Sequence, residues 1–270
     1  MLIDTHCHLN IMAKKTWDTP LTQEDLESIQ IIVNQSSAQG IKKIINVGTS
    51  VEESLNCIRI AQRFPTVHAA IGIHPNDCTI NWREDIETLN TALKKTAPGI
   101  IVAIGECGID KHYSNYDLAR QRDAFKSQIE LALEHNLPLI IHTRDAGDET
   151  LACLASFKDE MLRGTIHCFS EDLSFAHDAF NLGFVIGIGA AITYPKNEQL
   201  RTVVKAVALE KIILETDAPF LPPQHMRGKQ NSPVHIVDIA RYIAELRQTT
   251  FEDIAQTTTQ SAEKLFRLEK

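Results

Sequence analysis

Short runs rich in β-branched residues recur along the chain, and each is followed by a stretch with helical periodicity. The eight runs are 2–5, 43–47, 67–73, 101–105, 139–141, 164–166, 184–189 and 211–215. Several are almost wholly apolar, as expected of parallel strands with helices on one face and a packed barrel interior on the other. Alternation of this kind gives either an open doubly wound sheet or a closed barrel. Eight repeats favour closure, so we predict a TIM-like (β/α)₈ parallel barrel.

The length of 270 residues suits one such barrel, since these domains usually take about 250 residues. No linker-like segment divides the sequence, so we expect one domain over residues 1–270. Thr22 and Asp25 have the spacing of a helix start, and Gly40 is expected to end that helix. A second helix is expected from about Asp117 to His135. We expect two carboxy-terminal helices, over 233–246 and 251–266, to complete an outer ring of helices.

The composition excludes several classes of protein. The amino terminus lacks the pattern of a secretory signal, and no apolar run approaches the ~20 residues that span a bilayer. We therefore expect a soluble, cytoplasmic protein with no membrane partner. The net charge of −8 argues against a generally basic nucleic-acid binder, because phosphate contacts need positive surface. A local site remains compatible with this charge if divalent cations offset its carboxylates.

The six cysteines form no CxxC pair, so reduced thiols are expected rather than a disulfide framework. Cys7, Cys107 and Cys168 each follow a histidine or glutamate that the motifs below single out. Neighbouring side chains on a strand point to opposite faces, so we expect these three thiols to pack toward the helices.

Ionisable residues recur where the predicted strands end, which is where catalytic groups project in a parallel barrel. They are His6 and His8 after the first run, Glu106 after the fourth, His142 after the fifth, His167 after the sixth and Asp217 after the eighth. Residues two apart on a strand share a face, so His6 and His8 can both reach one ion. A lone HxH pattern is weak, but buried ionisable groups are costly unless they are paired or bound to metal. The complete set therefore indicates a metal centre.

Seven segments carry a family resemblance in their order and spacing: DTHCHL, GIHP, GECGID, IIHTRDA, HCFS, ETDAPFLPP and RGKQNSP. Over nearly its whole length the chain resembles the TatD family of metal-dependent deoxyribonucleases. The resemblance implies hydrolysis of phosphodiester bonds in DNA, acting as a 3′ exonuclease on single-stranded or end-processed DNA. It also implies two divalent ions, one held by His6, His8, Glu106 and Asp217, and a second held by Glu106, His142 and His167.

Two ions about 3.5–4 Å apart can bind a phosphate oxygen and lower the pKa of a water molecule between them. Asp217 is placed to take the proton of that water, so Asp217 and the bridging Glu106 are the expected catalytic residues. The identity of the metal stays open among Mg²⁺, Mn²⁺, Zn²⁺ and Fe²⁺, although Mg²⁺ normally prefers fewer imidazoles. No obligatory protein partner is implied.

Further polar residues near the strand ends have two interpretations each. His74 contacts the substrate or is a loop histidine beside a rigid proline. Arg144 pairs with phosphate or with a neighbouring carboxylate. Arg227 and Asn231, in a Pro-bounded loop, touch the substrate or fix the loop. Glu215 shares the strand face of Asp217 and is expected to support a ligand or form an interior ion pair.

Two departures from the family pattern lie beside the expected site, Glu171 after HCFS, and Lys111 with His112 after GECGID, and they put the substrate preference in question. An alternative function is an amidohydrolase or esterase acting on a small molecule or an aminoacyl-tRNA. Many barrels of that broader group bridge their metals with a carbamylated lysine, whereas the fourth run here supplies Glu106. A non-catalytic metal-binding protein is a third hypothesis, against which the intact ligand set argues.

Overall fold

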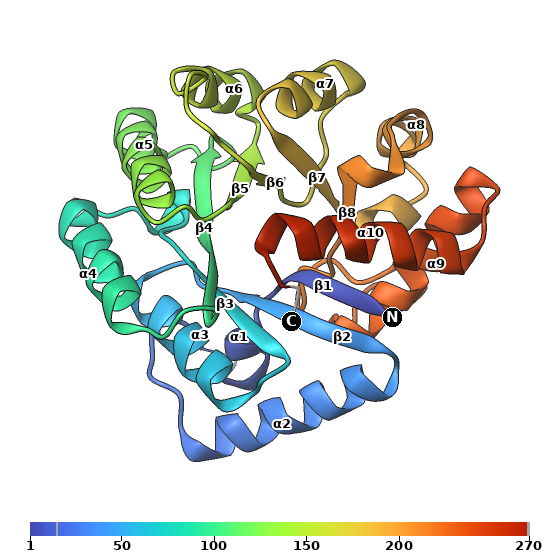
Figure 1. Ribbon diagram of the computed structural model, residues 1–270, viewed down its shortest axis with the longest axis horizontal. Coiled ribbons are helices and arrows are strands. Elements are labelled where there is room, and N and C mark those ends of the chain that lie inside the picture. The colour runs from blue at the N-terminus through green and yellow to red at the C-terminus, as the bar shows by residue number, and fades with distance from the viewer. Residues whose placement is uncertain (15, 269–270) are drawn as a thin grey trace.

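The computed structural model describes residues 1–14 and 16–268, which form a ring of parallel strands surrounded by helices (Figure 1). Within these ranges the strands are β1 (Leu2–Cys7), β2 (Ile41–Val47), β3 (Val67–Ile71), β4 (Ile101–Asp110), β5 (Leu139–Arg144), β6 (Gly164–Ile166), β7 (Phe184–Ile188) and β8 (Ile212–Leu214). Each strand pairs in parallel with the next one in the sequence, in the order β1 to β8. The predicted (β/α)₈ barrel is confirmed.

At their carboxyl ends, β1, β4 and β5 extend beyond the bounds expected from the sequence, and each extension includes a residue of the site. Strand β4 continues to Asp110 because Gly108 to Asp110 pair with His142 to Arg144 of β5. Gly108 permits this close approach, since its φ is 143° and an added Cβ would lie 1.9 Å from the His142 carbonyl oxygen. Glu106 and His142 therefore lie within strands rather than after them, on backbone that is held by ladder hydrogen bonds.

Between β1 and β8 the barrel is closed by a β-bridge that joins Cys7 to Ala218 and by hydrogen bonds to a side chain. The Thr216 amide donates to Asp4 Oδ1 at 2.9 Å, and the Thr216 hydroxyl donates to Asp4 Oδ2 at 2.6 Å. Burial raises the pKa of Asp4 to about 8, although both bonds from Thr216 oppose this shift. A neutral carboxyl near pH 7 thus joins the two ends of the sheet without burying a charge.

Most helices lie outside the ring, each between two consecutive strands. They are α1 (Leu9–Lys14), α2 (Gln23–Ala38), α3 (Val51–Arg63), α4 (Trp82–Lys95), α5 (Leu118–Glu134), α6 (Gly147–Ala155), α7 (Leu173–Asn181) and α8 (Glu198–Ala206), with 3₁₀ turns at Pro75–Asp77, Ala190–Thr193, Leu209–Lys211, Gln224–Met226 and Pro233–His235. The predicted helix starts are confirmed: Thr22 and Asp25 form a capping box on α2, and Asp117 caps α5. Among the helices of the described ranges, none has the length and apolar character that crossing a bilayer requires.

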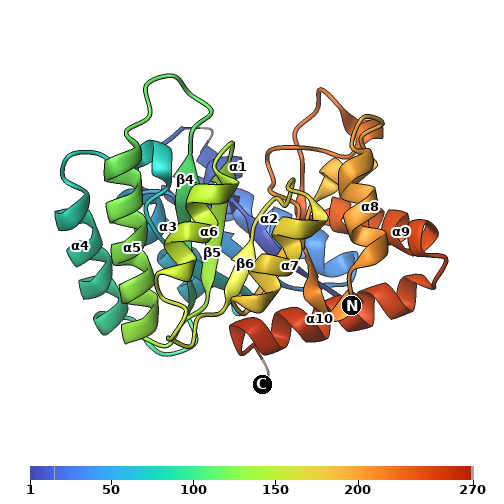
Figure 2. The ribbon, with the colours of Figure 1, turned by 90° about the horizontal axis from the view of Figure 1, so that it is seen from above.

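The last two helices differ in their placement. Helix α9 (Ile236–Arg247) lies in the outer ring as expected, but α10 (Phe251–Phe266) does not. Figure 2 shows α10 across one end of the barrel, opposite the loops that follow β4 and β8. Its Ala262, Leu265 and Phe266 are buried among the inward-facing side chains of the strands. The sequence pattern gives α10 an apolar face but not the surface which that face covers, so its expected place in the ring was wrong.

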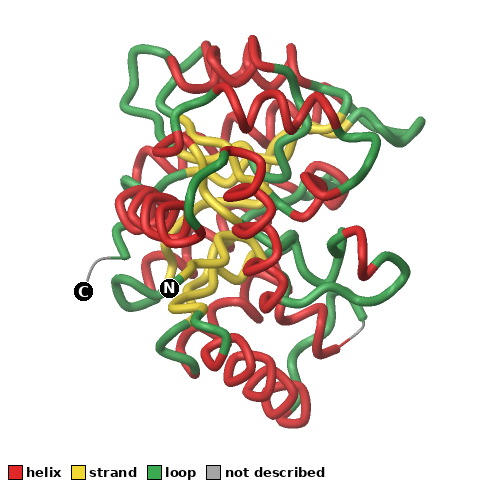
Figure 3. Tube along the Cα trace, turned by 90° about the vertical axis from the view of Figure 1, so that its right-hand side faces the viewer, coloured by secondary structure: helices red, strands yellow, loops and turns green. Residues whose placement is uncertain are grey.

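The core therefore has two parts, one inside the barrel and one between the strands and the surrounding helices. Figure 3 shows the strands, in yellow, with helices, in red, around them. Cys7 and Cys107 belong to the outer part, as the alternation along a strand predicted. Cys168 does not follow the prediction, because β6 ends at Ile166 and Cys168 has a left-handed backbone with φ of 47°. None of the cysteines forms a disulfide within the described chain, in line with the expected reduced thiols.

The role of α10 can be tested with Phe266→Ala. Phe266 is 3% exposed, and removing a buried phenyl ring typically costs about 3–5 kcal/mol. We expect chemical denaturation to show a loss of this size in the free energy of unfolding. The matched control is Met161→Ala, since Met161 is 90% exposed and its loss should change the free energy by no more than about 0.5 kcal/mol. Equal effects of the two substitutions would show that α10 does not seal the barrel.

Candidate metal centre

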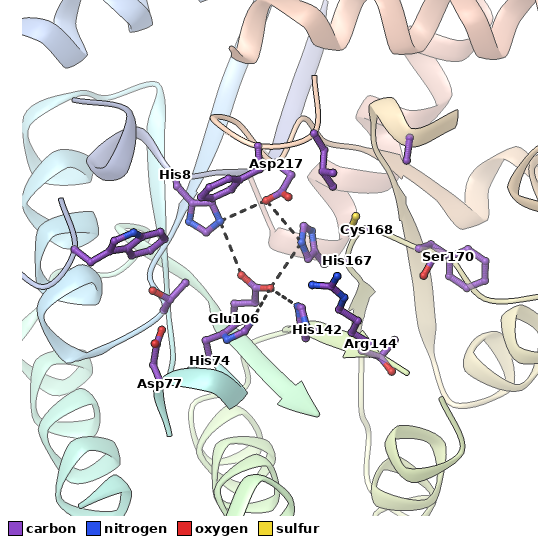
Figure 4. A pocket seen from close by; sticks show the side chains of 17 residues that line it. His8, His74, Asp77, Glu106, His142, Arg144, His167, Cys168, Ser170 and Asp217 are labelled. Atoms are coloured by element: carbon purple, nitrogen blue, oxygen red, sulfur yellow. Dashed lines mark hydrogen bonds and ion pairs between the residues drawn. The ribbon is translucent and has the colours of Figure 1, made fainter. Parts of the chain in front are cut away.

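A cavity of about 670 Å³ opens at the carboxyl ends of the strands. Five of the six predicted metal residues line it, namely His8, Glu106, His142, His167 and Asp217. Figure 4 shows their side chains pointing toward one another across the cavity. His6 lies beneath them and is fully buried. The structure thus brings together all six residues that the sequence placed at strand ends.

The first half of the cluster gathers around His6 and His8, which project from β1 and the residue just after it. Their Nε2 atoms lie 3.2 Å apart. Glu106 Oε2 lies 3.4 Å from the His6 nitrogen and 3.9 Å from the His8 nitrogen. Asp217 Oδ1 lies 3.8 Å and 3.5 Å from the same two atoms. Two nitrogens and two carboxylate oxygens therefore face one small space.

The second half uses the other oxygen of Glu106. Glu106 Oε1 lies 2.8 Å from His142 Nδ1 and 3.7 Å from His167 Nε2. His167 Nε2 also lies 3.8 Å from Asp217 Oδ1. The two oxygens of one carboxylate thus face two different groups of histidines, and Glu106 lies between them (Figure 4).

These groups fit divalent cations. Nitrogen and oxygen ligands that bind one ion at about 2.0–2.2 Å lie roughly 3–3.5 Å from one another. The first half of the cluster shows separations of 3.2–3.9 Å. His6, His8 and Glu106 are buried and Asp217 is partly buried, and no lysine or arginine of the described chain forms an ion pair with Glu106 or Asp217. Several sets of three ligand atoms lie within 4.8 Å of one another, among them His6, His8 and Glu106.

His8 and His142 are hydrogen-bonded through the ring nitrogen that faces away from the cluster, and His167 forms an ion pair there. His8 Nδ1 lies 2.8 Å from the Val47 carbonyl oxygen. His142 Nε2 lies 3.1 Å from Asp110 Oδ2, and His167 Nδ1 lies 2.9 Å from Glu215 Oε1. An acceptor at this position fixes the ring and increases its basicity toward a metal. Glu215 thereby takes the supporting position that the sequence suggested for it.

Sequence reasoning missed Asp110, although a signal for it existed. Asp110 lies four residues after Glu106, and an even spacing places two side chains on the same face of a strand. The predicted fourth strand ended at 105, so the rule was not applied to Asp110. In the structure Asp110 is buried and also accepts from the Asn76 side chain at 2.9 Å and the His112 amide at 2.8 Å. These bonds fix the carboxylate that orients His142.

The charges of the cluster depend on one another. Burial opposes ionisation of Glu106, yet the neighbouring histidines, His167 foremost, hold the pKa of that carboxyl well below its usual range. Burial also opposes a charged His167, but Glu215, Glu106 and Asp217 together raise the pKa of that imidazole to about 10. Burial, with the charge of His142, lowers the pKa of His74 to about 3. The carboxylates are therefore ionised, and His74 is neutral near pH 7.

His74 and Arg144 both line the cavity. His74 Nε2 lies 3.7 Å from Glu106 Oε1, and its ring contacts that of His142 at a centroid distance of 4.4 Å. The Arg144 guanidinium extends toward the centre of the cavity in Figure 4. It forms no ion pair among the described residues, and its nearest aromatic contact is Tyr113 at 6.0 Å. The neighbouring carboxylate considered as an alternative partner for Arg144 is therefore not seen.

Arg227 and Asn231 are not among the residues that line the cavity in the described chain. The Arg227 guanidinium lies over the Tyr194 ring at 4.7 Å. Asn231 is buried and donates from its side-chain nitrogen to the carbonyl oxygens of Thr216 and Phe220, at 2.8 Å and 2.7 Å. Asn231 thus anchors the loop that follows β8.

The carboxyl group of Asp77 and the thiol of Cys168 also line the cavity. The sequence did not indicate either residue as part of the site. Burial, followed by the charges of Asp18 and Glu106, raises the pKa of Asp77 to about 6. Cys168 reaches the wall through its left-handed backbone, and burial raises the pKa of its thiol well above the usual value. Cys168 is therefore a neutral thiol beside His167 and Asp217.

The barrel, and the cluster of histidines and carboxylates at the carboxyl ends of its strands, together define a metal-dependent hydrolase of the (β/α)₈ barrel class. The chain matches the family described as TatD related DNase over residues 3–267, and it belongs to that family. The resemblance found in the sequence is thereby confirmed.

Individual relatives agree with this assignment. YabD of Bacillus subtilis, an uncharacterized metal-dependent hydrolase, is 34% identical over 268 residues, which cover 99% of this chain and 100% of YabD. The 3′-5′ ssDNA/RNA exonuclease TatD of Citrobacter rodentium is 32% identical over 240 residues, which cover 87% of this chain and 90% of that protein. Among solved structures, the TatD homolog YjjV of Escherichia coli K12 matches with a TM-score of 0.89 and 28% identity, over 99% of this chain and 98% of YjjV.

The support that Asp110 gives to His142 can be tested by metal binding. We expect Asp110→Ala to weaken the affinity for divalent metal by about 10–100-fold, because the outward nitrogen of His142 loses its acceptor. Isothermal titration of the metal into the metal-stripped protein measures the change. Asp178→Ala, which removes an exposed carboxylate from α7, is the control and should leave the affinity unaltered. Unchanged affinity in Asp110→Ala would contradict the role assigned to Asp110.

Proposed function

We propose that this protein hydrolyses phosphodiester bonds of DNA at a centre of two divalent ions. His6, His8, Glu106 and Asp217 would hold one ion, and Glu106, His142 and His167 the other. The single observation that carries the proposal is the placement of Glu106, whose two oxygens face two separate groups of histidines. Two ions held in this way would lower the pKa of a water molecule and offset the charge of the phosphate oxygens.

Asp217 is the residue that accepts a proton in this proposal. Its contacts with His6, His8 and His167 all run through Oδ1, which leaves Oδ2 to take the proton of the attacking water. The pKa of Asp217 is lowered despite its burial, chiefly through its hydrogen bond with His8 and the charge of His167. The carboxylate is thus ionised and able to act as a base near neutral pH.

The backbone holds Asp217 in an unusual conformation that supports this role. Its φ of 57° lies in the left-handed region, which is uncommon for a residue other than glycine. The Asp217 amide donates to the His6 carbonyl oxygen at 2.9 Å, and the His8 amide donates to the Ala218 carbonyl oxygen at 2.7 Å. These bonds fix the carboxylate relative to both histidines of β1, and such conformations concentrate at functional sites.

His74 and Arg144 are suited to binding the phosphate. His74 Nδ1 accepts from the Asn76 amide at 3.1 Å, so a neutral His74 carries its proton on Nε2, which faces Glu106. That N–H can donate to a phosphate oxygen or to the leaving oxygen. Arg144 supplies a charged fork without a competing carboxylate among the described residues, and such forks match phosphate geometry.

The proposed direction of cleavage and the proposed preference for single-stranded nucleic acid rest on the name of a relative. The protein from Citrobacter rodentium is named a 3′-5′ ssDNA/RNA exonuclease, so we propose a 3′ exonuclease that prefers single-stranded ends. All residues of the proposed centre come from one barrel, which supports a single hydrolase domain over residues 1–270.

The departures at Lys111 and Glu171 lie where substrate preference would be set. Lys111 Nζ donates to Glu149 Oε1 at 2.5 Å, so its charge is already paired. Glu171 and Asp145 line a second cavity of about 460 Å³ that shares Arg144 with the first. Carboxylates beyond Arg144 would repel further phosphates, so we propose that few nucleotides are bound on this side.

The proposed activity predicts metal-dependent digestion of single-stranded DNA. EDTA should abolish the activity, and Asp217→Asn should reduce kcat by about 10²–10⁴-fold, since it removes the proton acceptor. The measurement is a time course on end-labelled single- and double-stranded DNA with Mg²⁺, Mn²⁺ or Zn²⁺, read for product length and for the end attacked. Activity that withstands both EDTA and Asp217→Asn would exclude the proposed mechanism.

The two arginines form a matched pair for a test of phosphate binding. We expect Arg144→Ala to raise KM for single-stranded DNA by about tenfold, the size expected from the loss of one charge-assisted hydrogen bond, with partial recovery in Arg144→Lys. Arg227→Ala should leave KM close to that of the wild type, because Arg227 lies on Tyr194 outside the cavity lining. The opposite ranking of the two alanine variants would place the phosphate over the loop after β8.

The alternative of an amidohydrolase or esterase keeps the same metal centre and changes the bond that is cleaved. It is tested by a panel of small esters, amides and an aminoacyl-tRNA beside the DNA substrates. Turnover of an ester or amide far above that of DNA would replace the proposed function. Binding of metal without turnover of any substrate would favour the non-catalytic hypothesis instead.

A further inference from the structure

Two exposed aromatic rings stand at one side of the cavity. Trp17 is 49% exposed and Phe220 is 40% exposed, and both line the cavity that contains the candidate metal centre. Their ring planes are within 5° of parallel, with centroids 6.2 Å apart. The Phe220 ring also meets the edge of His8 at a centroid distance of 5.8 Å. We call this pair the aromatic rim. Exposed apolar surface of this kind in a cavity indicates a binding site.

The backbone around Trp17 is held in place by a buried carboxylate. Glu53 accepts from the Asp18 amide at 2.6 Å and pairs with Lys14 Nζ at 2.8 Å. Lys14 Nζ also donates to the Thr19 carbonyl oxygen at 2.6 Å. Both residues that follow Trp17 are therefore tethered to Glu53 of α3, directly or through Lys14. The backbone next to the indole is thus anchored, which lowers the entropic cost of ordering this segment when a ligand binds.

Phe220 is tethered as firmly, from a segment about two hundred residues away in the sequence. Its amide donates to the Asp217 carbonyl oxygen at 2.8 Å. Its carbonyl oxygen accepts from the Asn231 side chain at 2.7 Å. The ring is thus positioned by the same turn that carries Asp217. The aromatic rim lies at a fixed distance from the candidate metal centre.

The charges near the rim select among ligands. Asp18 follows Trp17 directly, and Asp77 lines the same cavity. The two carboxylates are close enough for the charge of Asp18 to raise the pKa of Asp77. A phosphate at this place would be repelled by both. A flat, uncharged ring would not, and it would gain stacking contacts with the indole and phenyl rings.

We propose that the aromatic rim of Trp17 and Phe220 is a stacking site for an unpaired nucleobase, next to the phosphodiester that is cleaved. This inference rests on the proposed function for the identity of the substrate. Stacking accepts any base, because every base has a flat face, so the site favours single strands and frayed ends without reading sequence. A base held in a duplex is stacked on its neighbours and would have to leave them first.

Tryptophan fluorescence tests the stacking without depending on turnover. The chain has two tryptophans, Trp17 and Trp82, of which Trp82 is buried. The metal-loaded protein is titrated with a phosphorothioate-linked oligothymidine that resists hydrolysis, and with the same backbone lacking bases. We expect quenching by the base-bearing strand and little by the base-free strand. Trp17→Phe keeps Trp82 and should show no quenching that depends on the bases. Equal quenching by both strands, or base-dependent quenching that persists in Trp17→Phe, would overturn the inference.

Kinetics on a natural phosphodiester strand give a second readout. We expect Trp17→Ala and Phe220→Leu each to raise KM by about tenfold, as loss of a stacking partner does, with kcat little changed. Trp17→Phe should recover most of the loss. Abasic terminal nucleotides should raise KM for the wild type, and by a smaller factor for Trp17→Ala, which keeps only Phe220. Ile31→Ala, which removes an exposed apolar side chain from α2, is the control and should behave as the wild type.

The two proposals fail in distinguishable ways. If the protein digests DNA and treats base-bearing and abasic ends alike, the stacking site is excluded while the proposed function stands. If base-dependent quenching of Trp17 occurs but no nucleic acid is cleaved, the stacking site stands and the nuclease function is excluded.

Discussion

The join between β1 and β8 is the constraint on which the rest of the site depends. Asp4 and Thr216 link the first and last strands through a buried, neutral carboxyl. The join places His6, two residues after Asp4, beside Asp217, one residue after Thr216, and the Asp217 amide donates to the His6 carbonyl oxygen. Residues more than two hundred positions apart in the sequence thereby come within ligand distance. An open doubly wound sheet would leave these two strands apart, and the cluster would not assemble.

Burial of charge explains why the remaining residues are arranged as they are. Glu106 is buried and ionised, and the histidines around it stabilise its charge. Asp110 and the Val47 carbonyl accept from the outer nitrogens of His142 and His8, and Glu215 forms an ion pair with the outer nitrogen of His167. A cation at the centre of the cluster would offset the charge of the buried carboxylates and would bind the inner nitrogens of the histidines. The affinity for a divalent cation thus follows from how the barrel stabilises its own carboxylates.

The sequence predicted the barrel and the six clustered residues because both signals are local: an apolar run, then a polar residue where it ends. Asp110 was missed because the strand pattern weakens at Gly105 although the ladder continues to Asp110. Cys168 was placed on the wrong side because alternation holds only within a strand, and β6 ends two residues earlier. The aromatic rim has no local signal, because Trp17 and Phe220 come from two loops that are brought together by closure of the barrel. An apolar face likewise identified α10 as a helix without showing what it packs against.

The position of α10 has a consequence for how a polymer can reach the ions. Side chains of the strands fill the interior of the barrel, and Phe266 and its neighbours of α10 cover one end of it. A polymer therefore cannot pass through the barrel. The polymer can only insert a terminus into the cavity at the open end or lie across that opening, and the product must leave by the same opening. The closed end of the barrel thus bears on how a polymer is cut at the open end, either by removal of units from a terminus or by cleavage in the middle of the chain.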